Sequence, residues 1–267
     1  MSIPARIVVA GLMLAATHAL GEAATAPSPL RICLPSDDAP RSDKDRGVGV
    51  DIDVARVLAT ELTRPLTLVW LPELGEIDEV SDFNFRPLLG DQCDAHLSVP
   101  GVVALGPYRR VLDLTDPYYG AAYELIPATA AWQWGEPAPG TIAVMANSVA
   151  HVAIDAADLP WSMRPTTDDI VRAVASREAE LGLVWGPDLG PFDVSRAAAF
   201  APPPVLRWNL HAATRRDDAL LDAFNRVFGD PGFASRIARI LTRHGVPVRR
   251  PFESVYTPET LRAIQAQ

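Results

Sequence analysis

The stretch that decides the fold is GVDIDVARVLATEL, residues 49–62. Its apolar residues recur at helical spacing and predict a helix with one buried face, formed by Val54, Val57, Leu58 and Leu62. The segments around it predict buried strands at residues 30–34, 66–71 and 95–99, with a short helix at residues 85–89. Strands that alternate with helices indicate an α/β fold with a parallel, doubly wound sheet.

The same alternation begins again beyond residue 117. Further strands are predicted at residues 122–126, 141–145 and 181–185, with helices that begin near Asn147 and Thr167. The three prolines at 202–204 cannot join a strand ladder, so they predict a linker, and residues 205–212 would return the chain to its first part. The remaining residues predict helices with apolar stripes at 220–228 and 237–244, then one that Thr257 caps.

This order predicts two doubly wound α/β lobes joined by a hinge. We expect residues 1–26 to be a signal peptide, residues 27–122 and 206–267 to form the first lobe, and residues 123–205 to form the second. Arg6 precedes an apolar run at residues 7–20 that small residues follow, which is the order of a secretory signal peptide. The alternative is an uncleaved anchor, although a membrane span needs about 20 apolar residues. We therefore expect export to the periplasm, with no membrane insertion after cleavage.

Composition narrows the function classes. The chain has 267 residues and a net charge of −9, which argues against nucleic-acid binding because that function needs a basic stripe. The histidines lack metal-ligand spacing, and the sequence has no phosphate-binding glycine loop and no serine elbow. We therefore expect a protein that is not an enzyme and that holds no metal or other cofactor.

The two cysteines, Cys33 and Cys93, both follow the predicted signal peptide. In an oxidising compartment such a pair predicts a disulfide. The alternative is two buried free thiols. A bridge that closes a loop of about 60 residues would stabilise the fold by roughly 4 kcal/mol, because it restricts the unfolded chain.

Four segments occur in an order and spacing typical of one known family. They are residues 49–62, the PYR at 107–109 followed by DLTDPYY at 113–119, the unit at 167–185, and residues 224–247, which end in HGVP. Together they cover nearly all of the mature chain, and they resemble the polar amino-acid family (family 3) of periplasmic solute-binding proteins. The resemblance implies a type II fold, in which two lobes close over a ligand. Some dehydratases share this fold.

Further details resemble one subgroup. Cys33 at the end of the first strand, QCD at residues 92–94 and VWGP at residues 184–187 are similar to binding-protein-like accessories of periplasmic quinoprotein alcohol dehydrogenases. Those accessories are linked to PQQ-dependent methanol oxidation, so this resemblance implies a quinoprotein dehydrogenase as partner. The alternative is an orthodox transporter receptor, which would meet an ABC permease and bind a small carboxylate or an amino-acid-like solute.

Arg109 and the pair Asn147-Ser148 are the first candidates for ligand binding. A guanidinium makes paired hydrogen bonds to a carboxylate, and in the amino-acid binders the matching arginine holds the α-carboxylate. The helix that begins at Asn147-Ser148 would present free N–H groups to an anionic group. The alternatives are a solvated arginine and a simple helix cap.

Trp185 and Asp37 complete the candidate site. In the amino-acid binders an acidic residue near the position of Trp185 usually meets the ligand's ammonium, so Trp185 argues against an amino acid and favours a flat ligand or a partner protein. Asp37, with Asp38, follows the first strand, at the sheet edge where an α/β fold places its ligand, and the pair could bind a cation or an amine. The alternatives are a core tryptophan and a solvated turn.

Overall fold

The computed structural model describes residues 27–71, 84–127, 132–190, 192 and 200–266. The predicted signal peptide, residues 1–26, lies outside the described residues. Within the described part of the chain, no helix combines the length and the apolar character needed to cross a membrane.

The first part of the chain folds as its alternating pattern predicts. Strand β1 (Leu30–Pro35) pairs in parallel with β4 (Leu66–Leu71) on one side and with β5 (Ala95–Val99) on the other. Helix α1 (Val50–Glu61) connects β1 to β4, and the short helix α2 (Arg86–Leu89) precedes β5. Val54 and Leu58 on the apolar face of α1 are fully buried, so the predicted helix and its buried face are confirmed.

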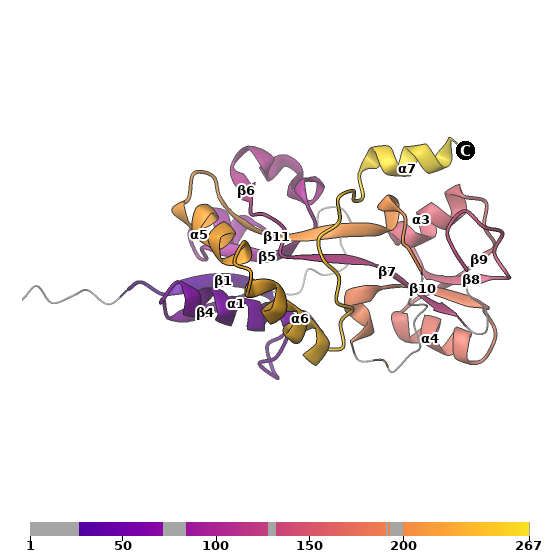
Figure 1. The fold of residues 1–267 in the computed structure, drawn as a ribbon, viewed down its shortest axis with the longest axis horizontal. Helices are drawn as coiled ribbons and strands as arrows, with labels where there is room; N and C mark the ends of the chain where they lie inside the picture. Colours follow the sequence, from indigo (N-terminus) through magenta and orange to yellow (C-terminus); the bar gives the residue numbers. More distant parts are fainter. Residues whose placement is uncertain (1–26, 72–83, 128–131, 191, 193–199, 267) are drawn as a thin grey trace, which may run out of the picture.

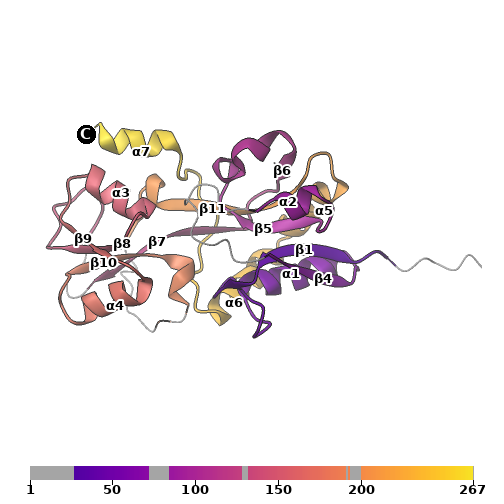
Figure 2. The ribbon, with the colours of Figure 1, turned by 180° about the vertical axis from the view of Figure 1, so that it is seen from behind.

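Two long strands connect the lobes. Strands β7 (Tyr119–Pro127) and β11 (Arg207–Arg215) pair antiparallel where they cross between the lobes. In the first lobe β11 continues beside β5 and β6 (Leu112–Leu114), and in the second lobe β7 continues beside β10 (Leu181–Trp185). One sheet of order β4-β1-β5-β11-β7-β10-β8-β9 therefore runs through the molecule, and both views show a lobe at each end of it (Figures 1 and 2).

The second lobe repeats the parallel arrangement. Strand β8 (Ile142–Met145) pairs in parallel with β10 and with the edge strand β9 (Trp161–Arg164). Helices α3 (Val149–Ala156) and α4 (Thr167–Ala175) begin at Ser148 and Thr166, whose hydroxyls accept hydrogen bonds from backbone N–H groups of the first turn. The two-lobed α/β prediction is confirmed, although the short edge strand β9 was not predicted.

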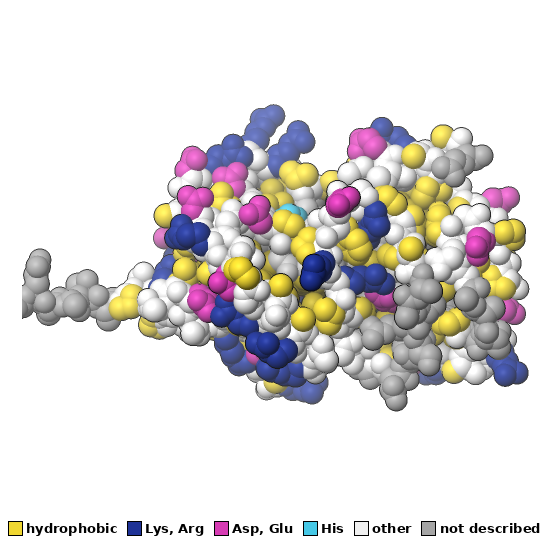
Figure 3. All heavy atoms as spheres, in the orientation of Figure 1, with side chains coloured by type: hydrophobic (Ala, Val, Ile, Leu, Met, Phe, Trp, Pro, Cys, Tyr) yellow, Lys and Arg dark blue, Asp and Glu magenta, His cyan; other side chains and the backbone are white. Residues whose placement is uncertain are grey.

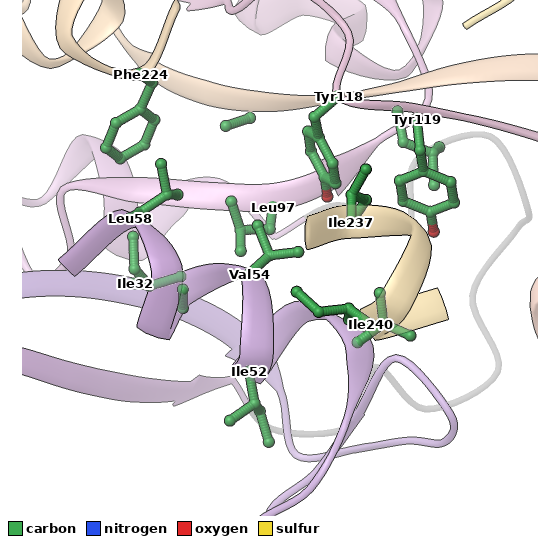
Figure 4. Packing of buried hydrophobic residues seen from close by; sticks show 14 of the residues in the cluster. Ile32, Ile52, Val54, Leu58, Leu97, Tyr118, Tyr119, Phe224, Ile237 and Ile240 are labelled. Carbon is green, nitrogen blue, oxygen red and sulfur yellow. The ribbon is translucent and has the colours of Figure 1, made fainter. Parts of the chain in front are cut away.

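Each lobe has its own core. In the first lobe α5 (Ala219–Phe228) and α6 (Phe233–Arg243) pack with α1 and the sheet around Ile32, Leu97 and Phe224 (Figure 4). The second lobe packs around Leu125, Val144 and Leu183. Helix α7 (Pro258–Gln265) joins this second core through Leu261 and Ile264, whereas the sequence placed residues 206–267 in the first lobe. Thr257 and Thr260 form the capping box that fixes the start of α7.

Residues 247–256, which we define as the strap, run from the end of α6 across the hinge to α7 (Figure 1). Asn209 on β11 exchanges two hydrogen bonds with the backbone of Phe252, at 2.9 and 2.7 Å. Arg249 makes a bidentate ion pair with buried Glu124 on β7, at 2.6 and 2.8 Å. The strap is therefore a third connection between the lobes. It lies on the face that Figure 3 shows, where the upper outline of the molecule is indented between the two lobes.

Candidate functional site

A small hairpin between β1 and α1 forms the first-lobe side of the junction, which is the place where the two lobes meet. Its strands, β2 (Asp37–Asp38) and β3 (Ser42–Asp43), pair antiparallel. The first N–H groups of α1 donate to its turn, from Val50 to the carbonyl of Pro40 at 3.0 Å and from Asp51 to the carbonyl of Arg41 at 2.9 Å. The free donors at the helix N-terminus therefore fix the hairpin, and with it the backbone of Arg41.

Asp51, in the first turn of α1, is the centre of a buried polar network. Its side chain accepts a hydrogen bond of 2.7 Å from the Ser98 hydroxyl, and the Tyr118 hydroxyl lies 3.5 Å from the same oxygen. Burial raises the pKa of Asp51 to about 7, although the bond from Ser98 and the charge of Arg41 both act to lower it. The network joins α1, β5 and the start of β7 beneath the hairpin.

Arg41 lies among three carboxylates. Its Nη2 donates to Asp38 at 2.7 Å. Burial alone would lower the pKa of Arg41, but the negative charges of Asp38, Asp188 and Asp51 together raise it above its ordinary value. Its Nε is buried and has no hydrogen-bond partner among the described residues.

Asp188 comes from the other lobe, where the turn η2 (Gly186–Leu189) directly follows β10. Burial raises the pKa of Asp188 to about 6, even though the charge of Arg41 opposes this rise. We define Asp38, Arg41, Asp51 and Asp188 as the junction cluster. It brings charged groups of both lobes to one place.

Gly190 shows how closely the lobes approach beside this cluster. A Cβ atom on Gly190 would lie 3.0 Å from the Cγ of Pro40 and 2.4 Å from the carbonyl oxygen of His244. The second-lobe backbone therefore touches both the hairpin and the turn that follows α6. A residue with a side chain does not fit there without moving backbone.

The Tyr118 and Tyr119 rings lie side by side at one end of the first core, with their hydroxyls pointing the same way (Figure 4). Tyr119 is 1% exposed, and its hydroxyl has no hydrogen-bond partner among the described residues. Burial raises the pKa of Tyr119, and the charge of Asp51 raises it further. Both tyrosines therefore stay neutral and act as hydroxyl groups at the junction.

Trp185 lies at the end of β10 in a cluster of aromatic rings at the hinge. Its ring meets Trp208 edge to face at a centroid distance of 5.1 Å and lies 5.6 Å from Tyr123. Trp208 in turn stacks on Tyr256 of the strap at 5.3 Å. Trp185 packs against the cores of both lobes, so it fills space at the hinge and is only partly exposed.

The other predicted ligand residues belong to separate elements. Arg109 is exposed at the end of η1 (Val102–Arg110), and its guanidinium makes no hydrogen bond or ion pair with a described residue. Asp37 is exposed on β2. Asn147 is exposed with a φ of 56°, and the buried Ser148 caps α3 by accepting from the N–H of His151. No hydrogen bond among described residues joins Arg109, Asp37 and this pair.

The QCD segment at residues 92–94 is part of the first-lobe framework. Cys33 and Cys93 form a disulfide, which confirms the predicted pairing. Asp94 pairs with Arg31 at 2.6 Å and with Arg64 at 3.3 Å. Although its burial acts the other way, the bonds and charge of Arg31 lower the pKa of Asp94. These contacts fix the start of β5 to β1.

Sequence reasoning missed Arg41 and Asp51 as site residues. Both stand within or beside motifs that the sequence singled out, Arg41 after the Asp37-Asp38 loop and Asp51 in the segment 49–62. The signal that could have found them is a charge at a predicted core position and a cation three residues after an acidic pair. Among the described residues, no group of three or more histidine, cysteine or acidic side chains could hold a metal ion.

Comparison with known proteins finds likeness at the level of structure. No family model matches the sequence, and a search of curated proteins finds no match. The structure of MxaJ from Methlophaga aminisulfidivorans MPT is 22% identical, covers 82% of this chain and 99% of its own, and superposes with a TM-score of 0.61. XoxJ, a periplasmic binding protein from Methylobacterium extorquens AM1, is 17% identical over 82% of this chain and 98% of its own, with a TM-score of 0.56.

A substrate binding domain is also similar in shape. Substrate binding domain 2 of Lactococcus lactis GlnP, in an open conformation, is 12% identical, covers 81% of this chain and 95% of its own, and gives a TM-score of 0.65. All three identities are below 25%, so the likeness establishes the fold alone. This chain therefore has the two-lobed α/β fold of the type II periplasmic binding proteins.

Proposed function

We propose that this chain, with its type II binding-protein fold, is an exported accessory protein that binds a quinoprotein alcohol dehydrogenase in the periplasm. In this role the protein is not an enzyme, and its partner is a folded protein. The resemblance at Cys33, Cys93 and Trp185 favours the accessory role over a transporter receptor. MxaJ and XoxJ, at 22% and 17% identity, are among the structures that share this fold.

The observation that carries the proposal is the way the hinge is built. Trp185 packs with Trp208 and Tyr123, and Tyr256 of the strap extends this aromatic cluster to α7. The strap adds the bidentate pair of Arg249 with Glu124 on a connecting strand. Aromatic packing and a buried ion pair resist the hinge motion by which a transporter receptor captures its ligand. A stiff two-lobed body suits recognition of a protein surface, since little ordering is needed on binding.

One observation favours the second candidate, a receptor for a small carboxylate that works with an ABC permease. Arg109 keeps an exposed guanidinium without a partner among the described residues, so it is free to make paired hydrogen bonds to a carboxylate. Asn147 and Ser148 at the start of α3 would then contribute from the second lobe. Asp37 would be a further polar contact on the hairpin.

The two candidates are separated by thermal unfolding of the mature, oxidised protein. One series contains small acids, amino acids and alcohols, and the other contains a purified quinoprotein alcohol dehydrogenase from the source organism. A ligand at 100 times its dissociation constant adds about 2.7 kcal/mol of stability. We expect stabilisation by the dehydrogenase alone. Stabilisation by one small carboxylate that disappears in Arg109→Ala would overturn the accessory role and favour the receptor.

A further inference from the structure

The junction cluster has an unusual composition for a place where two lobes meet. Three aspartates surround a single cation, and they come from the hairpin, from α1 and from η2 of the other lobe. Asp188 makes no hydrogen bond or ion pair within 4 Å of another described residue. Among the described residues, the charge of Arg41 is the one that acts to lower the pKa of Asp188. The second-lobe carboxylate therefore depends on a first-lobe arginine for its compensating charge.

We propose that Arg41 is an internal cation that ties the two lobes together, because Asp38 holds its guanidinium in the hairpin against which the second-lobe segment that carries Asp188 packs at Gly190. The chain itself thus supplies the positive charge that joins the lobes. This inference rests on the proposed function and deepens it. In a solute receptor the bound ligand would join the lobes at the junction, whereas here Arg41 does so. A ligand bearing an ammonium or guanidinium group would have to compete with Arg41 for the same carboxylates.

Three hydrogen bonds fix the hairpin that carries Arg41. Asp38 accepts from Nη2 at 2.7 Å, and the N–H of Asp51 donates to the Arg41 carbonyl at 2.9 Å. The Ser42 hydroxyl donates to the carbonyl of Pro35 at 2.8 Å and closes the hairpin onto β1. Because first-lobe contacts fix the arginine, its attraction for Asp188 acts on the second lobe as a whole.

The packing at Gly190 brings the second-lobe segment that carries Asp188 against the hairpin that carries Arg41. Gly190 directly follows η2, and because it has no side chain its backbone comes against Pro40, next to Arg41 in the hairpin, and against the turn after α6. Attraction between opposite charges grows as their separation falls, and it is stronger away from water. Without Arg41, the same approach of the lobes would bring three carboxylates together. Repulsion between their negative charges would oppose that approach.

The distance between the lobes tests the tie directly. Ser235 on α6 and Ala175 on α4 are exposed, and Cys33 and Cys93 are consumed in the disulfide, so Ser235→Cys and Ala175→Cys accept a pair of spin labels. We expect Arg41→Ala to lengthen and broaden the label distance and to lower the melting temperature. The control Arg172→Ala removes an arginine that pairs with two aspartates but is exposed on α4, and it should change neither. An unchanged distance in Arg41→Ala would overturn the proposal.

Two further measurements separate a tie from a general folding defect. Asp188→Asn keeps the shape of the side chain and removes only the second-lobe charge, so it should also lengthen the distance. Millimolar ethylguanidinium should shorten the distance again in Arg41→Ala, by entering the vacated position, and urea at the same concentration should not. Rescue that persists in Arg41→Ala/Asp188→Asn would contradict the role of Asp188. The distances are measured on the protein alone, so a negative result leaves dehydrogenase binding untouched.

Discussion

The wild-type protein should lose stability as pH rises, because Asp51 is buried, and replacing Asp51 by asparagine should remove this loss. The pKa of this carboxyl rises from 3.8 to about 7 on folding, because the side chain is buried. Between these values the folded state holds a proton that the unfolded state releases, so the free energy of unfolding falls as pH rises from about 4 to about 7. About three pKa units at roughly 1.4 kcal/mol each make this loss about 4 kcal/mol. Asparagine keeps the shape and can accept the hydrogen bond from Ser98.

The assay is urea unfolding of both proteins from pH 4 to pH 8, followed by tryptophan fluorescence. We expect the stability of Asp51→Asn relative to the wild type to rise by about 4 kcal/mol across this range. Asp53→Asn in the same helical turn is the matched control, because the pKa of Asp53 shifts in the opposite direction. Despite partial burial, hydrogen bonds from His244 and Arg56 lower the pKa of Asp53 below its ordinary 3.8, so that variant should lose stability by a nearly constant amount from pH 4 to pH 8. A flat difference for Asp51→Asn would refute the reasoning.

Two other changes test the framework. Cys33→Ser/Cys93→Ser opens a link between residues 60 apart and should cost roughly 4 kcal/mol in urea unfolding; a cost below about 1 kcal/mol would mean that the bridge does not restrict the unfolded chain. Arg249→Met leaves the buried Glu124 carboxylate unpaired and should cost about 3 kcal/mol. The double variant Arg249→Met/Glu124→Leu should recover most of that loss, and a double variant no more stable than the single one would contradict a buried charge as the cause.

The sequence predicts the layered fold well because local patterns determine it. The strands predicted at residues 66–71, 95–99 and 181–185 coincide with β4, β5 and β10, since each is a short apolar run between turn residues. Helix α1 follows from the spacing of Val54 and Leu58. The cap of α7 follows from Thr257 and Pro258.

The contacts between distant segments could not be predicted in the same way. The docking of α7 on the second lobe depends on Leu261 and Ile264 meeting a core about 100 residues away, and local periodicity says nothing of that meeting. The position of Arg41 beside Asp188 depends equally on how the lobes approach at Gly190. Trp185 was singled out from the sequence for a ligand or a partner, and its packing at the hinge depends on Trp208 from another strand.

The most direct test of the accessory role is a binding titration between the immobilised mature protein and a purified quinoprotein alcohol dehydrogenase from the source organism, with bovine serum albumin as the control analyte. We predict saturable binding of the dehydrogenase that small carboxylates do not displace. No binding to the dehydrogenase, together with saturable binding of a small carboxylate that requires Arg109, would contradict this role and identify the protein as a solute receptor.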